Sequence, residues 1–77
     1  MKLSKAEAVL YLYDHFLENH VVIKEDTLFS IEITDLTFRR YMSEIRCYLQ
    51  EFHPEMEIHY RKGEGIYLYR RISNPER

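Results

Sequence analysis

The sequence predicts an α+β domain in which three helices precede a two-stranded β-hairpin. Apolar residues recur at helical spacing up to residue 52, and they alternate with polar residues after Pro54. The length of 77 residues suffices for one domain and not for two. We expect the domain to span residues 1–71, with residues 72–77 as a flexible C-terminal tail.

The first helix should begin after Ser4, because Ser4 and Glu7 have the spacing of a capping box. Behind this cap, apolar residues recur on one helical face: Ala6, Val9, Leu10, Tyr13, Phe16 and Leu17. The helix is expected to run to about Asn19. The β-branched run at residues 21–23 can then pair as a short edge strand.

Two further helices follow. Glu25 and Asp26 open a short second helix, where acidic residues favour the helix dipole, and it should end near Glu32. The third helix is long, with Thr34 as N-cap, and spans about 34–52. At about 100° per residue its apolar side holds Phe38, Tyr41, Met42, Ile45, Tyr48, Leu49 and Phe52. Its opposite side holds Leu36, Arg39, Arg40, Ser43, Cys47 and Gln50.

A β-hairpin is predicted after Pro54. Met56, Ile58 and Tyr60 alternate with polar residues in its first strand. Residues 62–65, K-G-E-G, form the turn, and in the returning strand Ile66 and Leu68 alternate with Tyr67 and Tyr69. Three helices followed by such a hairpin have the order of a winged helix-turn-helix, in which the hairpin is the wing.

Charge is divided unevenly along the chain, although the net charge is only −2. Residues 1–36 hold three lysines and seven acidic residues, whereas residues 37–77 hold eight basic and six acidic residues. The basic excess falls on the third helix and the hairpin, and a basic stretch favours nucleic acid as partner.

Composition also bears on the compartment. The single cysteine, Cys47, excludes an internal disulfide, which suits a reducing compartment. The longest apolar run, residues 8–13, is too short to cross a bilayer, and no signal peptide is evident. We therefore expect a cytoplasmic protein without a membrane partner.

Residues 33–46, I-T-D-L-T-F-R-R-Y-M-S-E-I-R, resemble the signature V-S-R-R-T-I-R-R-D-I-x-x-L-R of DeoR-type winged-helix regulators. The stretch looks most like the N-terminal DNA-binding domain of WYL-domain transcriptional regulators. Matching positions are held by Thr34, Thr37, Phe38, Arg40, Ile45 and Arg46. G-I-Y-L at residues 65–68 resembles the G-Y-x-L that closes the family's wing, and the similarity spans roughly residues 3–70.

The sequence departs from the family pattern at several positions. Glu32 stands where the family usually has glycine, and Asp35 and Leu36 stand where basic or polar residues are common. Tyr41 replaces an aspartate, and Phe29 replaces a polar residue. The WYL ligand-sensing domain is absent from this sequence.

The resemblance implies a sequence-specific DNA-binding transcriptional regulator, with the third helix in the major groove and the wing at residues 61–65 on the backbone. The candidate DNA-binding residues are Thr34, Asp35, Leu36, Thr37, Arg39, Arg40, Ser43, Arg46, Arg61 and Lys62. Arginines can pair bidentately with guanine or bind phosphate, and an aspartate can accept from a cytosine amino group. The alternative for each is an ordinary solvated surface residue.

Five apolar residues are expected to be exposed together as an interface: Tyr11, Leu12, Phe29, Tyr67 and Tyr69. The expected partners are double-stranded DNA and either a second copy, as in dimers that read paired half-sites, or another protein. The alternative function is a winged-helix protein–protein interaction module, an antirepressor or modulator of another regulator, without DNA binding. Asp35, Leu36 and Glu64 favour that alternative.

We expect neither catalysis nor a cofactor. The four histidines and Cys47 have no metal-ligand spacing. No nucleophile–base pair or glycine-rich phosphate loop is present, and G-E-G alone is a hairpin turn. No small-molecule ligand is evident.

Overall fold

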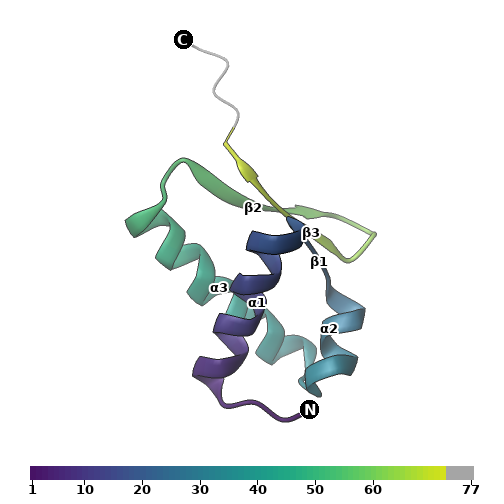
Figure 1. The fold of residues 1–77 in the computed structure, drawn as a ribbon. Helices are drawn as coiled ribbons and strands as arrows, with labels where there is room; N and C mark the ends of the chain where they lie inside the picture. Colours follow the sequence, from purple (N-terminus) through teal and green to yellow (C-terminus); the bar gives the residue numbers. More distant parts are fainter. Residues whose placement is uncertain (73–77) are drawn as a thin grey trace.

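Three helices lie on one side of a small antiparallel sheet in the computed structural model, which describes residues 1–72 (Figure 1). The elements are α1 (Lys5–Asn19), β1 (Val21–Ile23), α2 (Lys24–Ile31), α3 (Asp35–Phe52), β2 (Met56–Arg61) and β3 (Ile66–Arg71). The predicted α+β class, the three helices, the hairpin and the short strand at 21–23 are confirmed. Of the predicted tail only Ile72 is described, and its N–H donates to the carbonyl of Glu55. Residues 73–77 lie outside the described residues.

Both predicted helix caps are present. The Ser4 hydroxyl accepts from the N–H of Glu7 at 3.2 Å, and the Glu7 carboxylate accepts from the N–H of Ser4 at 3.0 Å. The Thr34 hydroxyl accepts from the N–H of Thr37 at 3.1 Å. These bonds satisfy amide groups that the first turn of a helix leaves without partners.

The turn between α2 and α3 is built around Glu32, which has a left-handed backbone with φ of 54°. Glycine adopts this conformation at no steric cost, whereas a side chain makes it unfavourable. The amino group of Met1 bonds the Glu32 carboxylate at 2.7 Å and the carbonyl of Ser30 at 3.1 Å. The amino terminus thereby braces this turn.

The sheet has the strand order β1-β3-β2, so β3 is its central strand. Tyr67 pairs with Tyr60 of β2 and Val22 of β1, and Tyr69 pairs with Ile58. Residues directly opposite each other project to the same face of a sheet. Because Val22 and Ile58 are buried, Tyr67 and Tyr69 also face inward.

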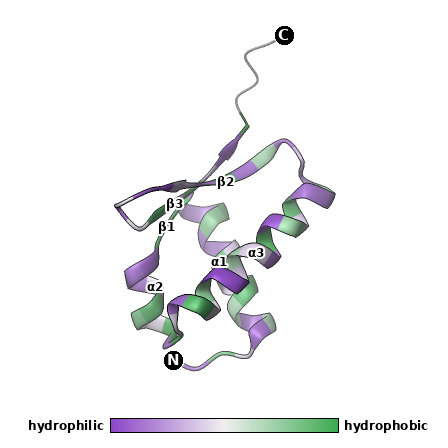
Figure 2. Cartoon of the chain, turned by 180° about the vertical axis from the view of Figure 1, so that it is seen from behind, coloured by the Kyte–Doolittle hydropathy of each residue, from purple (hydrophilic) through white to green (hydrophobic). Residues whose placement is uncertain are grey.

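The core lies between the helices and the sheet. From α2, Ile31 is buried and Leu28 packs against the main buried cluster, which is drawn from the other elements. This cluster comprises Leu12, Phe16, Val22, Phe38, Met42, Ile45, Leu49, Ile58, Tyr67 and Tyr69. Figure 2 shows hydrophobic residues alternating with hydrophilic ones along the helices, as expected of helices with one buried side. No helix within residues 1–72 is both long and apolar enough to traverse a bilayer.

The buried side of α1 differs from the predicted one. Ala8, Leu12 and Phe16 are buried, whereas Leu10 is 66% exposed and Leu17 is also exposed. The helix contacts α3, β1 and β3, and these contacts enclose the side of α1 that carries Leu12 and Phe16. In α3 the predicted apolar side is buried through Phe38, Met42, Ile45 and Leu49, while Tyr48 and Phe52 remain exposed.

Candidate nucleic-acid interface

Lys24 joins the start of α3 to the β2–β3 turn. Its N–H donates to the carbonyl of Gly65 at 2.9 Å, and its ammonium lies 2.9 Å from Oδ1 of Asp35. Lys24 also begins α2 directly after β1, so it links three parts of the fold. The first turn of α3 and the turn at residues 62–65 therefore lie close together on the same side of the molecule.

Asp35 is neutralised by two cations. Besides Lys24, the Nε of Arg39 lies 3.2 Å from its Oδ2, one helical turn further on. The bond from Lys24, strengthened by the charge of Arg39, lowers the pKa of the Asp35 carboxyl, and Asp35 in return raises the pKa of Lys24. The Asp35 carboxylate is thus paired within the protein. It orients Arg39, whereas the sequence suggested it as a contact for a cytosine amino group.

The exposed side of α3 carries the residues that the sequence placed there. Leu36, Arg39, Arg40 and Ser43 are all exposed. Within residues 1–72 Arg40 makes no ion pair, so its whole guanidinium is available to an external acceptor. Leu36 provides an apolar contact of the kind that meets a thymine methyl group.

Arg46 lies differently from its neighbours on α3. Its Nη2 donates to the carbonyl of Ile58 at 3.2 Å, and its guanidinium carbon lies 6.0 Å from the centre of the Tyr67 ring. Arg46 thus ties α3 to β2 and satisfies a carbonyl at the edge of the sheet. This bond engages one nitrogen of the guanidinium and holds Arg46 against the sheet.

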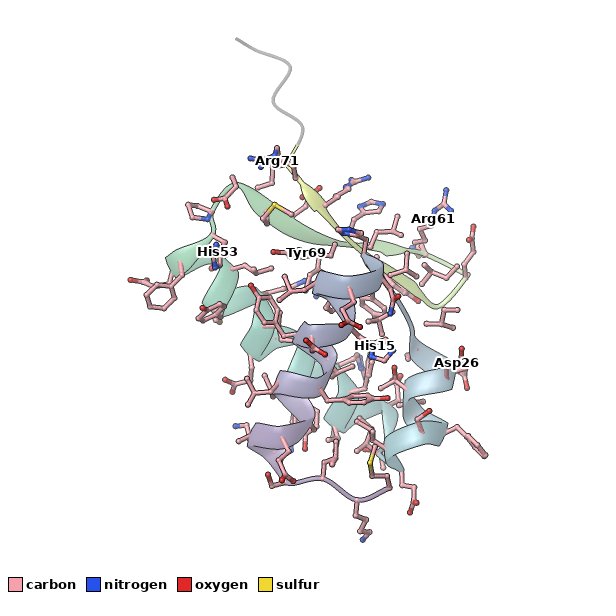
Figure 3. All side chains as sticks on the ribbon, viewed as in Figure 1. His15, Asp26, His53, Arg61, Tyr69 and Arg71 are labelled. Carbon is pink, nitrogen blue, oxygen red and sulfur yellow. The ribbon has the colours of Figure 1, made fainter. Side chains whose placement is uncertain are left out.

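The β2–β3 turn presents two further cations. Arg61 lies 3.8 Å from the Glu64 carboxylate, and Lys62 makes no ion pair within the described part of the chain. Gly63 and Gly65 have φ of 86° and 65°, which permits the tight turn. Figure 3 shows Arg61 at the turn end of the hairpin, whereas Arg71 lies at the opposite end of the sheet.

Thr34 and Thr37 are committed to the helix cap. The Thr34 hydroxyl accepts from the N–H of Thr37 and donates to the Thr37 hydroxyl at 3.0 Å. The N–H of Thr37 is therefore occupied. The hydroxyl of Thr37 and the N–H groups of the first helical residues remain as the polar groups nearest to a ligand at this end of α3.

Together these residues form a basic surface on α3 and the β2–β3 turn, which we call the arginine face. Its cations are Lys24, Arg39, Arg40, Arg61 and Lys62, and its anions are Asp35 and Glu64 together with Glu44, which borders Arg40. The remainder of the chain is correspondingly acidic, since the net charge is −2. A concentrated positive surface on an acidic protein is suited to attract a polyanion.

The predicted interface of five apolar residues is wrong for three of them. Leu12 is 1% exposed, and Tyr67 and Tyr69 are buried as well. Leu12 occupies the centre of the α1 contact, and both tyrosines face inward from the central strand. Tyr11 is half-buried, and only Phe29 is widely exposed, at 88%.

A different apolar surface is present on α1 and α3, and the sequence reasoning missed it. It contains Leu10 and Leu17 of α1 with Tyr48 and Phe52 of α3, all of them exposed. The available signal was periodicity, because Leu10 and Leu17 lie seven residues apart and Tyr48 and Phe52 lie four apart. All four had been assigned to the apolar sides of their helices.

Other site chemistry is sparse. Within residues 1–72 no three histidine, cysteine or acidic side chains gather closely enough to hold a metal ion. Cys47 is a free, exposed thiol on α3.

No protein-family model, curated protein or solved structure matches the chain significantly.

Proposed function

We propose that this protein is a sequence-specific DNA-binding transcriptional regulator with a winged helix-turn-helix fold. The order of its elements and the strand order β1-β3-β2 are compatible with that fold. In this proposal α2 and α3 form the helix-turn-helix, α3 enters the major groove, and the β2–β3 turn is the wing on the neighbouring backbone.

The proximity of two basic segments carries the proposal. Lys24 contacts both Gly65 in the turn and Asp35 at the start of α3, so it links the turn that carries Lys62 to the first turn of the helix that carries Arg39 and Arg40. A reading helix and a phosphate-binding loop must be adjacent if one duplex is to contact both. The ion pair also removes the repulsion between Asp35 and phosphate.

Each cation has a distinct proposed role. Arg40 makes no internal ion pair, so it is the candidate for bidentate pairing with guanine, which provides about 1–3 kcal/mol of discrimination. Arg39 is held by Asp35 through Nε and offers its two terminal nitrogens to phosphate. Lys62 and Arg61 would fix the register of the duplex without reading its sequence.

Selection from random double-stranded DNA at two salt concentrations tests the proposal. We expect enrichment of a defined site, with log K falling by about 0.9 per contacted phosphate for each unit of log salt. Affinity for the selected site should fall about 5- to 150-fold in Arg40→Ala, which corresponds to the loss of one base contact.

Arg71→Ala is the matched control, because Arg71 is an exposed arginine at the far end of the sheet. Its affinity should equal that of the wild type apart from a small general effect of charge. Failure to enrich any sequence, or equal losses in the two variants, would contradict specific recognition by Arg40.

A protein–protein interaction module on the same scaffold is the second candidate. The specific observation in its favour is that Arg39 and Arg61 are each paired with a carboxylate, which reduces the charge offered to DNA. This candidate predicts no salt-sensitive DNA binding and a stoichiometric protein partner.

A further inference from the structure

A groove between α1 and α3 is lined by apolar side chains that no other part of the described chain covers. It has a volume of about 370 Å³ and is lined by Val9, Leu10, Tyr13, Glu44, Ile45 and Tyr48. Leu17 and Phe52, 48% and 63% exposed, extend the apolar surface along the same two helices. We call this surface the α1–α3 groove.

The aromatic residues of the groove are held in place from inside. The Tyr13 and Tyr48 rings meet edge-on with centres 5.6 Å apart, and the Tyr48 and Phe52 rings lie 5.0 Å apart. Tyr13 also contacts the buried Tyr69 ring edge-on at 6.2 Å. A preorganised apolar surface loses little conformational entropy when a partner binds.

Acidic residues flank the groove on both helices. Asp14 lies four residues after Leu10 and three before Leu17, so it shares their side of α1. On α3, Glu44 precedes Tyr48 by four residues and Glu51 follows it by three. Lys5 is the basic residue beside them, and its ammonium is paired with Glu44 at 3.3 Å. Asp14 and Glu51 make no ion pair within residues 1–72.

The acidic residues beside the groove disfavour a second copy of the chain as its binding partner. A twofold dimer through the groove would place the same surface against itself and would bring the acidic residues that flank the groove in one copy towards those of the other. Like charges brought together at an interface are unfavourable. The complementary partner is apolar on one side and positively charged at its edges.

We propose that the α1–α3 groove binds a basic amphipathic helix of another protein. A helix placed between two others buries apolar residues at spacings of three and four, while lysines or arginines on its flanks reach the acidic residues. The groove adjoins the arginine face at Glu44, which also borders Arg40, whereas Leu10, Leu17, Tyr48 and Phe52 lie outside that face. The protein then has a basic face for one ligand and an acid-flanked apolar face for another.

A pair of designed peptides tests this directly with the full 77-residue chain. Both are helical, about 18 residues long, with leucines on one side and either lysines or glutamates on the other. We expect saturable 1:1 binding of the lysine peptide only, with nuclear magnetic resonance shifts at Leu10, Tyr13, Tyr48 and Phe52. Binding of the lysine peptide should weaken as salt is added.

Variants at exposed positions locate the binding site without unfolding the protein. Leu10→Gln with Phe52→Gln should weaken the lysine peptide about tenfold or more, because two apolar contacts are lost. Asp14→Asn with Glu51→Gln should weaken it and reduce its salt dependence. Phe29→Gln is the matched control at an exposed aromatic residue on α2, and it should bind as the wild type does.

Several results would overturn the proposal. Equal binding of the two peptides would show that the acidic residues do not select the partner. Absence of binding by either peptide would show that the groove is not a binding site for such a helix. An equal loss in Phe29→Gln would place the contact elsewhere. Sedimentation that showed a dimer dissociated by Leu10→Gln with Phe52→Gln would assign the groove to self-association. The experiment is independent of DNA binding, because none of these side chains belongs to the arginine face.

Discussion

Among single residues, Lys24 has the largest role in shaping the arginine face. It is the residue at which β1 becomes α2, and it reaches Gly65 with its backbone and Asp35 with its side chain. The side-chain bond is an ion pair at the protein surface, and such pairs contribute little to stability individually. Its consequence is geometric, since it sets the position of the β2–β3 turn relative to the start of α3.

Replacing Asp35 with asparagine should therefore change the acid dependence of stability. The pKa of Asp35 is lowered in the folded protein by Lys24 and then Arg39, so its contribution is present above the ordinary value of 3.8. That contribution is lost as the pH falls through the lowered pKa. At neutral pH Asp35→Asn should be less stable than the wild type, and the difference should close in acid.

Thermal unfolding at low salt between neutral pH and acid measures this difference. Asp14→Asn is the matched control, because Asp14 is an exposed aspartate of α1 that makes no ion pair in the described residues. A difference between the wild type and Asp35→Asn that stays constant at every pH would contradict the role of the ion pairs.

Among the elements, α1 shows how packing selects one face from a wide apolar arc. Most of the residues between Ala6 and Leu17 are apolar. Helical periodicity alone therefore does not determine which side of α1 faces the core. Contacts with α3, β1 and β3 select the orientation in which Leu12 and Phe16 are enclosed. Leu10 is left in the solvent-exposed groove.

Two leucine-to-alanine variants distinguish this orientation from the one expected from the sequence. Leu12→Ala should destabilise the protein by about 2–5 kcal/mol, because it creates a cavity in the core. Leu10→Ala should change stability by no more than about 0.5 kcal/mol, as is usual for surface positions. Urea denaturation followed by circular dichroism measures both, and a larger loss in Leu10→Ala would favour the predicted orientation.

Local signals predicted the elements well because they act within a few residues. The capping box at Ser4 and the cap at Thr34 are bonds to residues three positions away, so the sequence alone locates both helix starts. The side chains of β3 were misassigned, although the hairpin contained the necessary information. A turn at residues 62–65 pairs Tyr60 with Tyr67, and an inward Tyr60 then requires an inward Tyr67.

For the whole molecule, the contacts that shape the candidate site are long-range and could not be predicted. Lys24 meets Asp35 and Gly65, and Arg46 meets Ile58, across separations that no local pattern encodes. The same holds for the α1–α3 groove, whose two sides come from opposite ends of the helical region. The sequence identified the residue types of the arginine face, whereas their pairing depends on the assembled fold.

Tyr13 of α1 contacts Tyr48 of α3 and Tyr69 of β3, so a change at Tyr13 reports on the packing of all three elements. Burial, followed by the neighbouring Tyr69 hydroxyl, raises the pKa of Tyr13 to about 12 from its ordinary value of 10.0. The pKa of Tyr13 is higher in the folded protein than in the unfolded chain. The free energy of unfolding is therefore unaffected by this group below pH 10 and declines as the pH rises towards 12.

Tyr13→Phe keeps the ring and removes this titration. Relative to the wild type, the variant should therefore gain stability as the pH rises from 10 to 12, in urea denaturation at successive pH values. A smaller decline should persist in Tyr13→Phe, because burial also raises the pKa of Tyr67. Tyr11→Phe, at a half-buried tyrosine on another side of α1, is the control and should follow the wild type. Parallel curves for the wild type and Tyr13→Phe throughout this range would mean that Tyr13 is open to water in the folded protein, and that α1, α3 and β3 do not meet around it.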